Sequence, residues 1–304
     1  MSHETADFRY EGASTKSLVD VFGSSIETKR WSFRKKKQVD RVAFVFSGGG
    51  NKGACQVGML EGLVKNGFMP EIVVGCSVGS LNAAAFAKDP TLEGVEKLKK
   101  LWLRLSSEDI FPKGRFFGAW RFIEKRPAVF SSFGLEKVIS GHMGEVDFED
   151  LKIPLQVVAA SLHTGKEVWI DKGNVTKALL ASTALPGIFP PVYHEDVPLI
   201  DGGVLNDAPI SKAIELGATK IFLLSCSTLE RKIIEPLRPI ESMLYAFGIA
   251  VTGRLERELE ELKAGVEIIV LQFPGPYGLD WRDFDHSSEM IQRSFDLTNS
   301  HFKR

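Results

Sequence analysis

The fold is decided by the stretch RVAFVFSGGGNKGACQVGMLEGLVKNGFMPEIVVGCSVGSLNAAAFAKD, Arg41–Asp89. Two short apolar runs within it, Arg41–Phe46 and Glu71–Gly75, are typical of buried strands. A helical pattern follows each run, and the first helix is expected to stop at Gly67. Strand, helix, strand and helix at this spacing predict a parallel sheet with helices packed on it.

The rest of the chain continues the same alternation. A helix is expected from Thr91 to about Leu105, a long helix at about 240–264, and an amphipathic helix from about Ser287. One shift in composition occurs near residue 38, which predicts a tail, 1–38, and one domain, 39–304. Further strands are expected at LQVVAASL (155–162), KEVWI (166–170), PLI (198–200), KIFLLSCS (220–227) and VEIIVLQF (266–273).

The composition excludes several classes of protein. The chain has 304 residues, 44% of them hydrophobic and 25% charged, as in ordinary soluble domains. A net charge of −1 argues against a protein that coats nucleic acid. The three cysteines, Cys55, Cys76 and Cys226, lack metal-ligand spacing, which favours reduced thiols in a cytosol-like compartment. The chain shows no signal peptide and no apolar run of about 18 residues, so we expect a cytoplasmic protein whose contact with membrane, if any, is peripheral.

The tail contains the segment KRWSFRKKK, Lys29–Lys37, with six basic residues and two aromatic residues. A charge block of this kind is usually a solvated tail or linker. It is also the composition of a peripheral membrane anchor, because basic residues attract anionic lipid while Trp31 and Phe33 insert at the interface. Nucleic-acid binding is a third, weaker interpretation.

The loop SGGGNKG, Ser47–Gly53, contains a literal G-x-G-x-x-G between a strand and a helix. A dinucleotide site also needs an acidic residue about 20 positions later at the end of the second strand, whereas Glu71 opens that strand. A phosphate-binding loop would need Gly-Lys followed by Ser or Thr, which is missing. The alternatives are a tight turn with no ligand, or a loop whose exposed amides bind a negative oxygen at a helix N-terminus.

A serine stands between two glycines in Gly75-Cys76-Ser77-Val78-Gly79, the G-x-S-x-G pattern of a nucleophile elbow. The expected strand before it and helix after it are the context that this pattern requires, although a plain turn could carry a serine too. Adjacent parallel strands deliver their carboxyl ends to one edge of a sheet. We therefore expect Ser77 to lie beside the loop Gly48–Gly53.

A serine nucleophile needs a base to accept its proton, and a histidine is the usual one. None of the six histidines lies in a motif that presents it to a neighbour: His3, His142, His163, His194, His286 and His301. The order Ser77…Asp201…His286 is that of an α/β-hydrolase triad, but the elbow follows the wrong strand for that fold. Asp201, in Ile200–Val204, is the stronger candidate, since a carboxylate at a strand end can act as a general base. By itself, Asp-Gly is also a common turn.

Together these motifs resemble those of the patatin-like phospholipases. The resemblance rests on Gly48–Gly53, Gly75–Gly79 and Asp201–Gly203, in this order. The block ASTALPGIFPP, Ala181–Pro191, is similar to the segment that precedes the aspartate in bacterial members. The similarity covers roughly Arg41–Cys226, and three ordered motifs plus this block are highly specific.

The resemblance implies a three-layer α/β/α sandwich with a mainly parallel sheet. It also implies hydrolysis of acyl esters of lipids by a Ser–Asp dyad, without a metal or a cofactor. By motif, Ser77 is the nucleophile, Asp201 the base, and the Gly49 and Gly50 amides the oxyanion hole. The wider expected site comprises Gly48, Lys52 and Gly53 in the loop, Gly75 and Gly79 in the elbow, and Gly202 and Gly203 after the base.

Two positions need comment beside the family pattern. Lys52 stands where the family often has arginine, and lysine keeps the charge but loses the planar fork, which weakens the expectation of a structural ion pair. Cys76, beside the nucleophile, is interpreted as a buried small side chain or, less simply, as a redox handle.

One segment could form the mouth of a lipid site. Phe111–Pro127 mixes five aromatic with five basic residues, which suits either a lid over acyl chains and phosphate groups or aromatics packed in the core. Three functions stay open: a lipid acyl hydrolase, an acyltransferase or thioesterase on the same dyad, and a non-catalytic lipid-binding regulator.

Overall fold

The computed structural model describes residues 28–29 (backbone), 40–112, 128–226, 238–261, 265–273, 275 and 280–303. The basic segment Lys29–Lys37, beyond the backbone of its first residue, and residues 113–127 of the aromatic segment lie outside these ranges.

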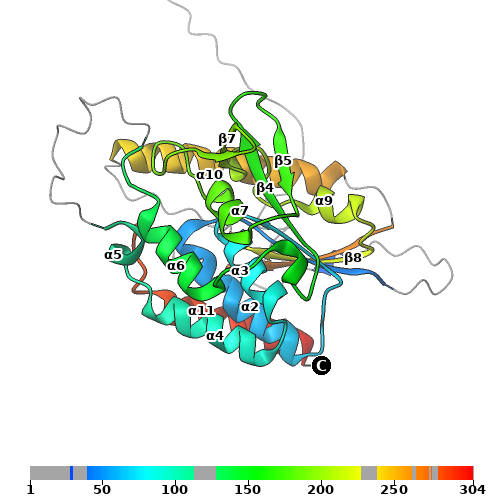
Figure 1. The fold of residues 1–304 in the computed structure, drawn as a ribbon. Helices are drawn as coiled ribbons and strands as arrows, with labels where there is room; N and C mark the ends of the chain where they lie inside the picture. The colour runs from blue at the N-terminus through cyan, green and yellow to red at the C-terminus, as the bar shows by residue number, and fades with distance from the viewer. Residues whose placement is uncertain are drawn as a thin grey trace, which may run out of the picture.

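Nine strands within the described ranges form one sheet, in the order β1-β9-β8-β2-β3-β4-β7-β6, with β5 paired to β4 (Figure 1). Strands β2, β3, β4, β8 and β9 run parallel to their neighbours in this group, which confirms the predicted parallel sheet. The strands are β1 (Thr28–Lys29), β2 (Val42–Phe46), β3 (Ile72–Cys76), β4 (Leu155–Ser161), β5 (Glu167–Ile170), β6 (Val192–His194), β7 (Val197–Asp201), β8 (Lys220–Ser225) and β9 (Glu267–Gln272).

Helices cover both faces of the sheet, which confirms the three-layer α/β/α architecture (Figure 1). Alternate residues of β2 divide between two apolar clusters: Phe44 and Phe46 belong to one, Ala43 and Val45 to the other. The first layer contains α2 (Ala54–Lys65), α3 (Val78–Lys88), α4 (Leu92–Arg104), α6 (Phe133–Met143), α7 (Val175–Ser182) and α11 (Ser287–Phe302). On the opposite side lie α9 (Ile210–Glu215) and α10 (Pro239–Glu261).

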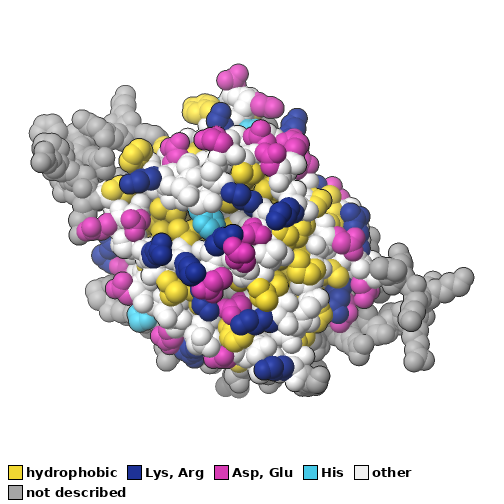
Figure 2. Space-filling model, turned by 60° about the horizontal axis from the view of Figure 1, so that its bottom comes forward, with side chains coloured by type: hydrophobic (Ala, Val, Ile, Leu, Met, Phe, Trp, Pro, Cys, Tyr) yellow, Lys and Arg dark blue, Asp and Glu magenta, His cyan; other side chains and the backbone are white. Residues whose placement is uncertain are grey.

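The outer surface of the first layer is polar and mixed in charge (Figure 2). On α4 the pairs Lys97–Glu93 and Lys100–Glu96 are one helical turn apart, and Lys99 reaches Glu61 on α2. Among the described residues, we find no helix with the length and apolar character needed to cross a bilayer. This surface is that of a water-facing helical layer.

Strand β7 runs in an unexpected direction to reach the sheet edge at which β2 and β3 end. It runs antiparallel to β4, with Leu199 opposite Ser161 and Asp201 opposite Ala159. Because β4 continues past the level at which β3 ends, β7 can begin beyond the sheet edge and finish at it. Asp201 therefore arrives at the edge that was expected from sequence, but from an antiparallel strand.

Two helices of the first layer pack with their backbones almost in contact. A Cβ atom on Gly58 of α2 would overlap the carbonyl oxygen of Ile291 on α11, and one on Gly62 would lie 2.7 Å from Thr298 Cβ. Glycine is required here by close approach, since neither residue has a positive φ. The α2 helix carries the glycine loop at its N-terminus, so this contact also anchors the loop.

Replacing Gly58 by alanine should separate α2 from α11. We expect Gly58→Ala to destabilise the fold by about 1–3 kcal/mol, the usual cost of overpacking. The matched control is Gly141→Ala on α6, where an added Cβ meets nothing within 4 Å. That change should stabilise by about 0.5–1 kcal/mol, because alanine is the better helix former. Urea unfolding measures both, and equal effects would contradict the packing account.

Candidate active site

Ser77 occupies a strained turn between β3 and α3. Its φ of 50° and ψ of −129° are unusual for a residue with a side chain, and such strain is common at nucleophile elbows. A Cβ atom on Gly79 would overlap Ser47 O, and one on Gly75 would lie 2.6 Å from Ser80 Cα. The two glycines that flank the elbow therefore permit the helix to approach the sheet.

The elbow is held from the side by Ser182, at the end of α7. The Ser77 amide donates to Ser182 Oγ at 2.9 Å, and that hydroxyl donates to Val158 O at 2.6 Å. Both bonds are formed in the protein interior, where they fix the strained backbone. Ser182 lies within the Ala181–Pro191 block, for which no chemical role was predicted from the sequence.

Asp201 lies directly against Ser77. The Ser77 hydroxyl donates to Asp201 Oδ2 at 2.6 Å, and the Gly203 amide donates to Asp201 Oδ1 at 2.8 Å. Burial, which leaves Asp201 only 2% exposed, raises its pKa to about 6, and the hydrogen bonds from Ser77 and Gly203 oppose that rise. Gly202 has no room for a Cβ beside Val158 O, so glycine is needed where the chain turns under the carboxylate.

The five expected oxyanion-loop residues are placed differently from one another. The Gly48 amide donates to Asp207 O at 3.0 Å, and the Lys52 amide donates to Gly49 O at 3.3 Å. Gly53 packs against Val78 and Trp102, which line the cavity, but is not itself a lining residue. Within the described parts of the chain, the amides of Gly49 and Gly50 donate to no acceptor, and both residues border the same cavity as Ser77. These two amides are thus available to a bound oxygen.

An apolar cavity of about 740 Å³ opens in front of Ser77 and Asp201. This volume lies within the range of small-molecule sites, about 300–1,000 Å³. Its walls come mainly from α3, α4, α6 and α10 and include Leu98, Leu101, Trp102, Leu135, Val138, Ile139, Phe189, Leu244, Phe247 and Val251. Phe111 also borders the cavity and stacks on Phe189, so the described end of the aromatic segment serves both as a cavity wall and as core.

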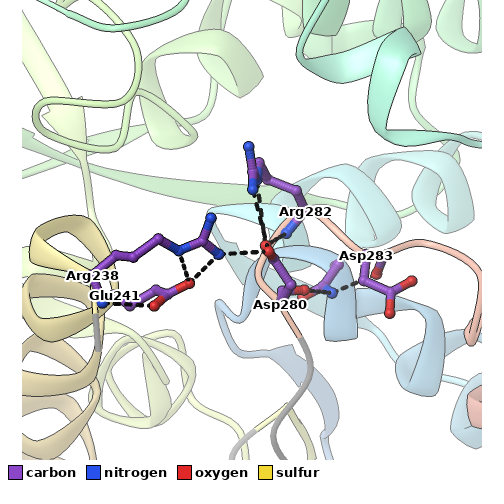
Figure 3. A network of polar contacts seen from close by, with 6 residues as sticks. Arg238, Glu241, Asp280, Arg282 and Asp283 are labelled. Carbon is purple, nitrogen blue, oxygen red and sulfur yellow. Dashed lines mark hydrogen bonds and ion pairs between the residues drawn. The ribbon is translucent and has the colours of Figure 1, made fainter. Parts of the chain in front are cut away.

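A polar network joins the start of α10 to the glycine loop (Figure 3). The Arg238 guanidinium pairs with Glu241 and, at 3.0 Å, with Asp280, which also receives Arg282. The side-chain amide of Asn51 (Nδ2) donates to the main-chain carbonyl oxygens of Asp280 and Asp283, at 2.9 and 2.6 Å. Asn51 is only 4% exposed and adjoins Gly50, so these bonds fix the position of the loop.

The histidine of the alternative triad has other partners. His286 precedes the first residue of α11, its side chain is 43% exposed, and it lies 3.6 Å from carboxylates of Asp283 and Glu289. His142 borders the cavity on α6, where burial, followed by the charge of Lys88, lowers its pKa. The hydrogen-bond partner of Ser77 is Asp201, not either histidine.

A second carboxyl group, unexpected from sequence, borders the site. Asp207 follows the short helix α8 (Gly203–Asn206) and faces the cavity beside Gly48. Burial raises its pKa to about 7, the negative charge of Asp201 adds to the rise, and Lys52 opposes it. The one available signal was an aspartate six residues after the proposed base, which no motif distinguishes from a turn residue.

The thiol beside the nucleophile is a buried packing group. Cys76 is fully buried, and burial followed by the charges of Asp201 and Asp207 raises its pKa well above the usual value. Reactive cysteines have the opposite environment, partly exposed and electropositive. The structure thus favours the simpler of the two interpretations of Cys76.

The family model of the patatin-like phospholipases matches residues 44–214, more than half of the chain. The chain belongs to the patatin-like phospholipase family. It is 26% identical to "Lysophospholipase nte1" of Aspergillus terreus over 193 residues, 62% of this chain but only 12% of that protein. An uncharacterised NTE family protein of Mycobacterium tuberculosis is 28% identical over 174 residues, 56% of this chain and 45% of that protein.

Solved structures show that this patatin-like chain shares its fold with two proteins of low sequence identity. VipD from Legionella pneumophila aligns over 88% of this chain and 67% of its own, at 15% identity and a TM-score of 0.53. Human GIVD cytosolic phospholipase A2 aligns over 90% and 60%, at 11% identity and a TM-score of 0.52. These alignments support the predicted fold.

The raised pKa of Asp207 predicts a cost to stability at high pH. The folded protein keeps the proton between about pH 4 and pH 7, where the unfolded chain has lost it, so stability falls as pH rises through this window. Asp207→Asn cannot ionise and should raise the Tm by at least about 2 °C at pH 8, with a smaller gain at pH 4.5. The control is Asp196→Asn on an exposed turn. An equal gain at both pH values would count against the assignment.

Proposed function

We propose that the protein is a serine acyl hydrolase that cleaves fatty-acyl esters of lipids, including phospholipids, through a Ser77–Asp201 dyad. The observation that carries the proposal is the 2.6 Å hydrogen bond from Ser77 Oγ to a buried Asp201 at the wall of an apolar cavity. The curated relatives include proteins named lysophospholipases, and one structural neighbour is named a cytosolic phospholipase A2. The family and the cavity thus favour the same class of substrate.

The first step is acylation of the serine. Asp201 accepts the Ser77 proton while Oγ attacks the acyl carbonyl carbon, and the alcohol then leaves with the proton that Asp201 returns. In the second step Asp201 takes a proton from water, which attacks the acyl-enzyme. The fatty acid is released as the bond to Ser77 Oγ breaks and Asp201 returns the proton to that oxygen. Because its pKa is about 6, most Asp201 carboxyls are ionised at neutral pH and able to accept a proton.

The oxyanion formed in each step needs donors that are already in place. The amides of Gly49 and Gly50 satisfy this need, since they have no acceptor within the described protein and border the cavity next to Ser77. Asn51 and the Gly48 bond to Asp207 O hold the loop from either side. The acyl chain is proposed to lie along the apolar walls of α4 and α6.

Removal of either member of the dyad should abolish most of the activity. On p-nitrophenyl esters from acetate to palmitate, Asp201→Asn should lower kcat/KM by about 10²–10⁴, the usual contribution of a general base. Ser77→Ala should lose at least as much, because no acyl-enzyme can form. His286→Ala is the matched control and should stay within about twofold of wild type.

Three results would change the proposal. Loss of activity in a folded His286→Ala would favour the Ser77–Asp201–His286 triad. Faster transfer to an added alcohol or thiol than to water would indicate an acyltransferase or a thioesterase. Lipid binding by a protein that hydrolyses no ester in the series would favour a non-catalytic regulator.

A further inference from the structure

Among the described carboxyl groups that border the cavity, Asp207 is the one with neither a role in the proposed mechanism nor an ion pair, since Glu241 and Asp280 both pair with Arg238. Its main-chain oxygen accepts the Gly48 amide at 3.0 Å. Its carboxyl oxygen Oδ1 lies so close to Gly48 that a Cβ there would overlap it. Gly48 in turn adjoins the nucleophile, because the same Cβ would lie 3.3 Å from Ser77 Cβ. The Asp207 carboxyl is thus in contact with the first residue of the oxyanion loop.

Burial and the charge of Asp201 disfavour an ionised Asp207, while the charge of Lys52 and the Gly48 amide favour it to a smaller extent. Asp201, at the end of β7, adds a like charge, and Cys76, at the end of β3, is a neutral thiol. Lys52, in the glycine loop, is the one cation in the described structure whose charge opposes these effects. Arg238 and Glu241, which also line the cavity, pair with each other. The remaining walls are mainly apolar and screen little.

A negative charge at this position acts against the chemistry at the loop. In the transition state a negative charge develops on the substrate oxygen that faces the Gly49 and Gly50 amides, next to Gly48. A protonated Asp207 leaves that charge undisturbed, whereas an ionised Asp207 repels it through a low-dielectric wall. The same repulsion makes it harder for Asp201 and Asp207 to ionise together.

We propose that Asp207 is a pH-dependent brake on the oxyanion loop: hydrolysis proceeds while its carboxyl is protonated and falls when it ionises. This inference rests on the proposed hydrolase function. It assigns Asp207 a role distinct from that of the base, since Asp201 must be ionised for activity and Asp207 must not. The enzyme is therefore active in the interval between the two ionisations.

The test is the dependence of kcat/KM on pH, from 5 to 9, for wild type and Asp207→Asn. With the pKa of Asp201 at about 6 and that of Asp207 at about 7, wild type should rise on the acid side, peak between pH 6 and 7, and fall above. Asp207→Asn should keep the acid limb and lose the alkaline one. At pH 8.5 the variant should be about tenfold or more faster than wild type. Product is read at the isosbestic wavelength of p-nitrophenol, so that its own titration does not distort the profile.

The two limbs of the wild type belong to a coupled pair, so a second variant is needed to identify the alkaline group. Lys52→Met removes the cation that favours ionised Asp207, and it should move the alkaline limb to higher pH without touching the carboxyl. This shift is independent of how well Asp207→Asn folds. Asp207→Ser is the alternative if the asparagine variant is unstable, and it should also lose the alkaline limb.

Each contrary result has a separate meaning. An alkaline limb that persists in Asp207→Asn would assign it to another group and overturn the inference. Activity lost at every pH in a folded Asp207→Asn would also overturn it, since the carboxyl would then be required rather than inhibitory. Uniformly reduced activity with unmoved limbs would indicate a structural role only. A wild type inactive on every ester across the pH range would instead count against the hydrolase function itself.

Discussion

The hydrogen bond from Ser77 to Asp201 is the interaction on which the rest of the site depends. It joins the ends of two strands that are not neighbours in the sheet, because β4 lies between β3 and β7. Strand β4 must continue past β3 so that β7 can return antiparallel and finish at the same level. The antiparallel strand β7 on this side of the sheet is thus what brings Asp201 to Ser77.

The site concentrates features that cost stability, and the surrounding core supports them. Ser77 has a strained backbone, two carboxyls have raised pKa values, and two loop amides have no acceptor within the described protein. Neighbouring residues hold the elbow and the loop in place. Ser182 bonds the elbow, while Asn51 and the close contact of α2 with α11 hold the loop. A site fixed in this way does not have to reorganise when charge develops on the substrate.

The sequence was most informative where chemistry and local geometry require the same residues. Glycines in the loop and the elbow, alternating strands and helices, and the Asp-Gly-Gly turn predicted the parallel sheet and the edge at which the site lies. The antiparallel path of β7 could not be predicted, because the apolar residues before Asp201 do not show whether their strand runs parallel or antiparallel to its neighbour. Asp207 and Asn51 were missed because their roles arise from contacts with Gly48 and with residues 280–283, which only the folded chain provides.

In the proposed mechanism a carboxylate takes the place of histidine, because burial changes its basicity. An exposed aspartate, with a pKa near 3.9, is too weak a base for an alcohol, whereas histidine titrates near 6.5. Burial of Asp201 against the apolar wall raises its pKa to about 6, close to that of histidine. The Ser77 and Gly203 hydrogen bonds limit the rise, so that the group stays ionised at neutral pH. An acyl chain that filled the cavity would exclude more water and raise the basicity of Asp201 further. Under the proposed function, the apolar cavity that would hold the acyl chain also raises the pKa of the proposed base, which links the class of substrate to the chemistry.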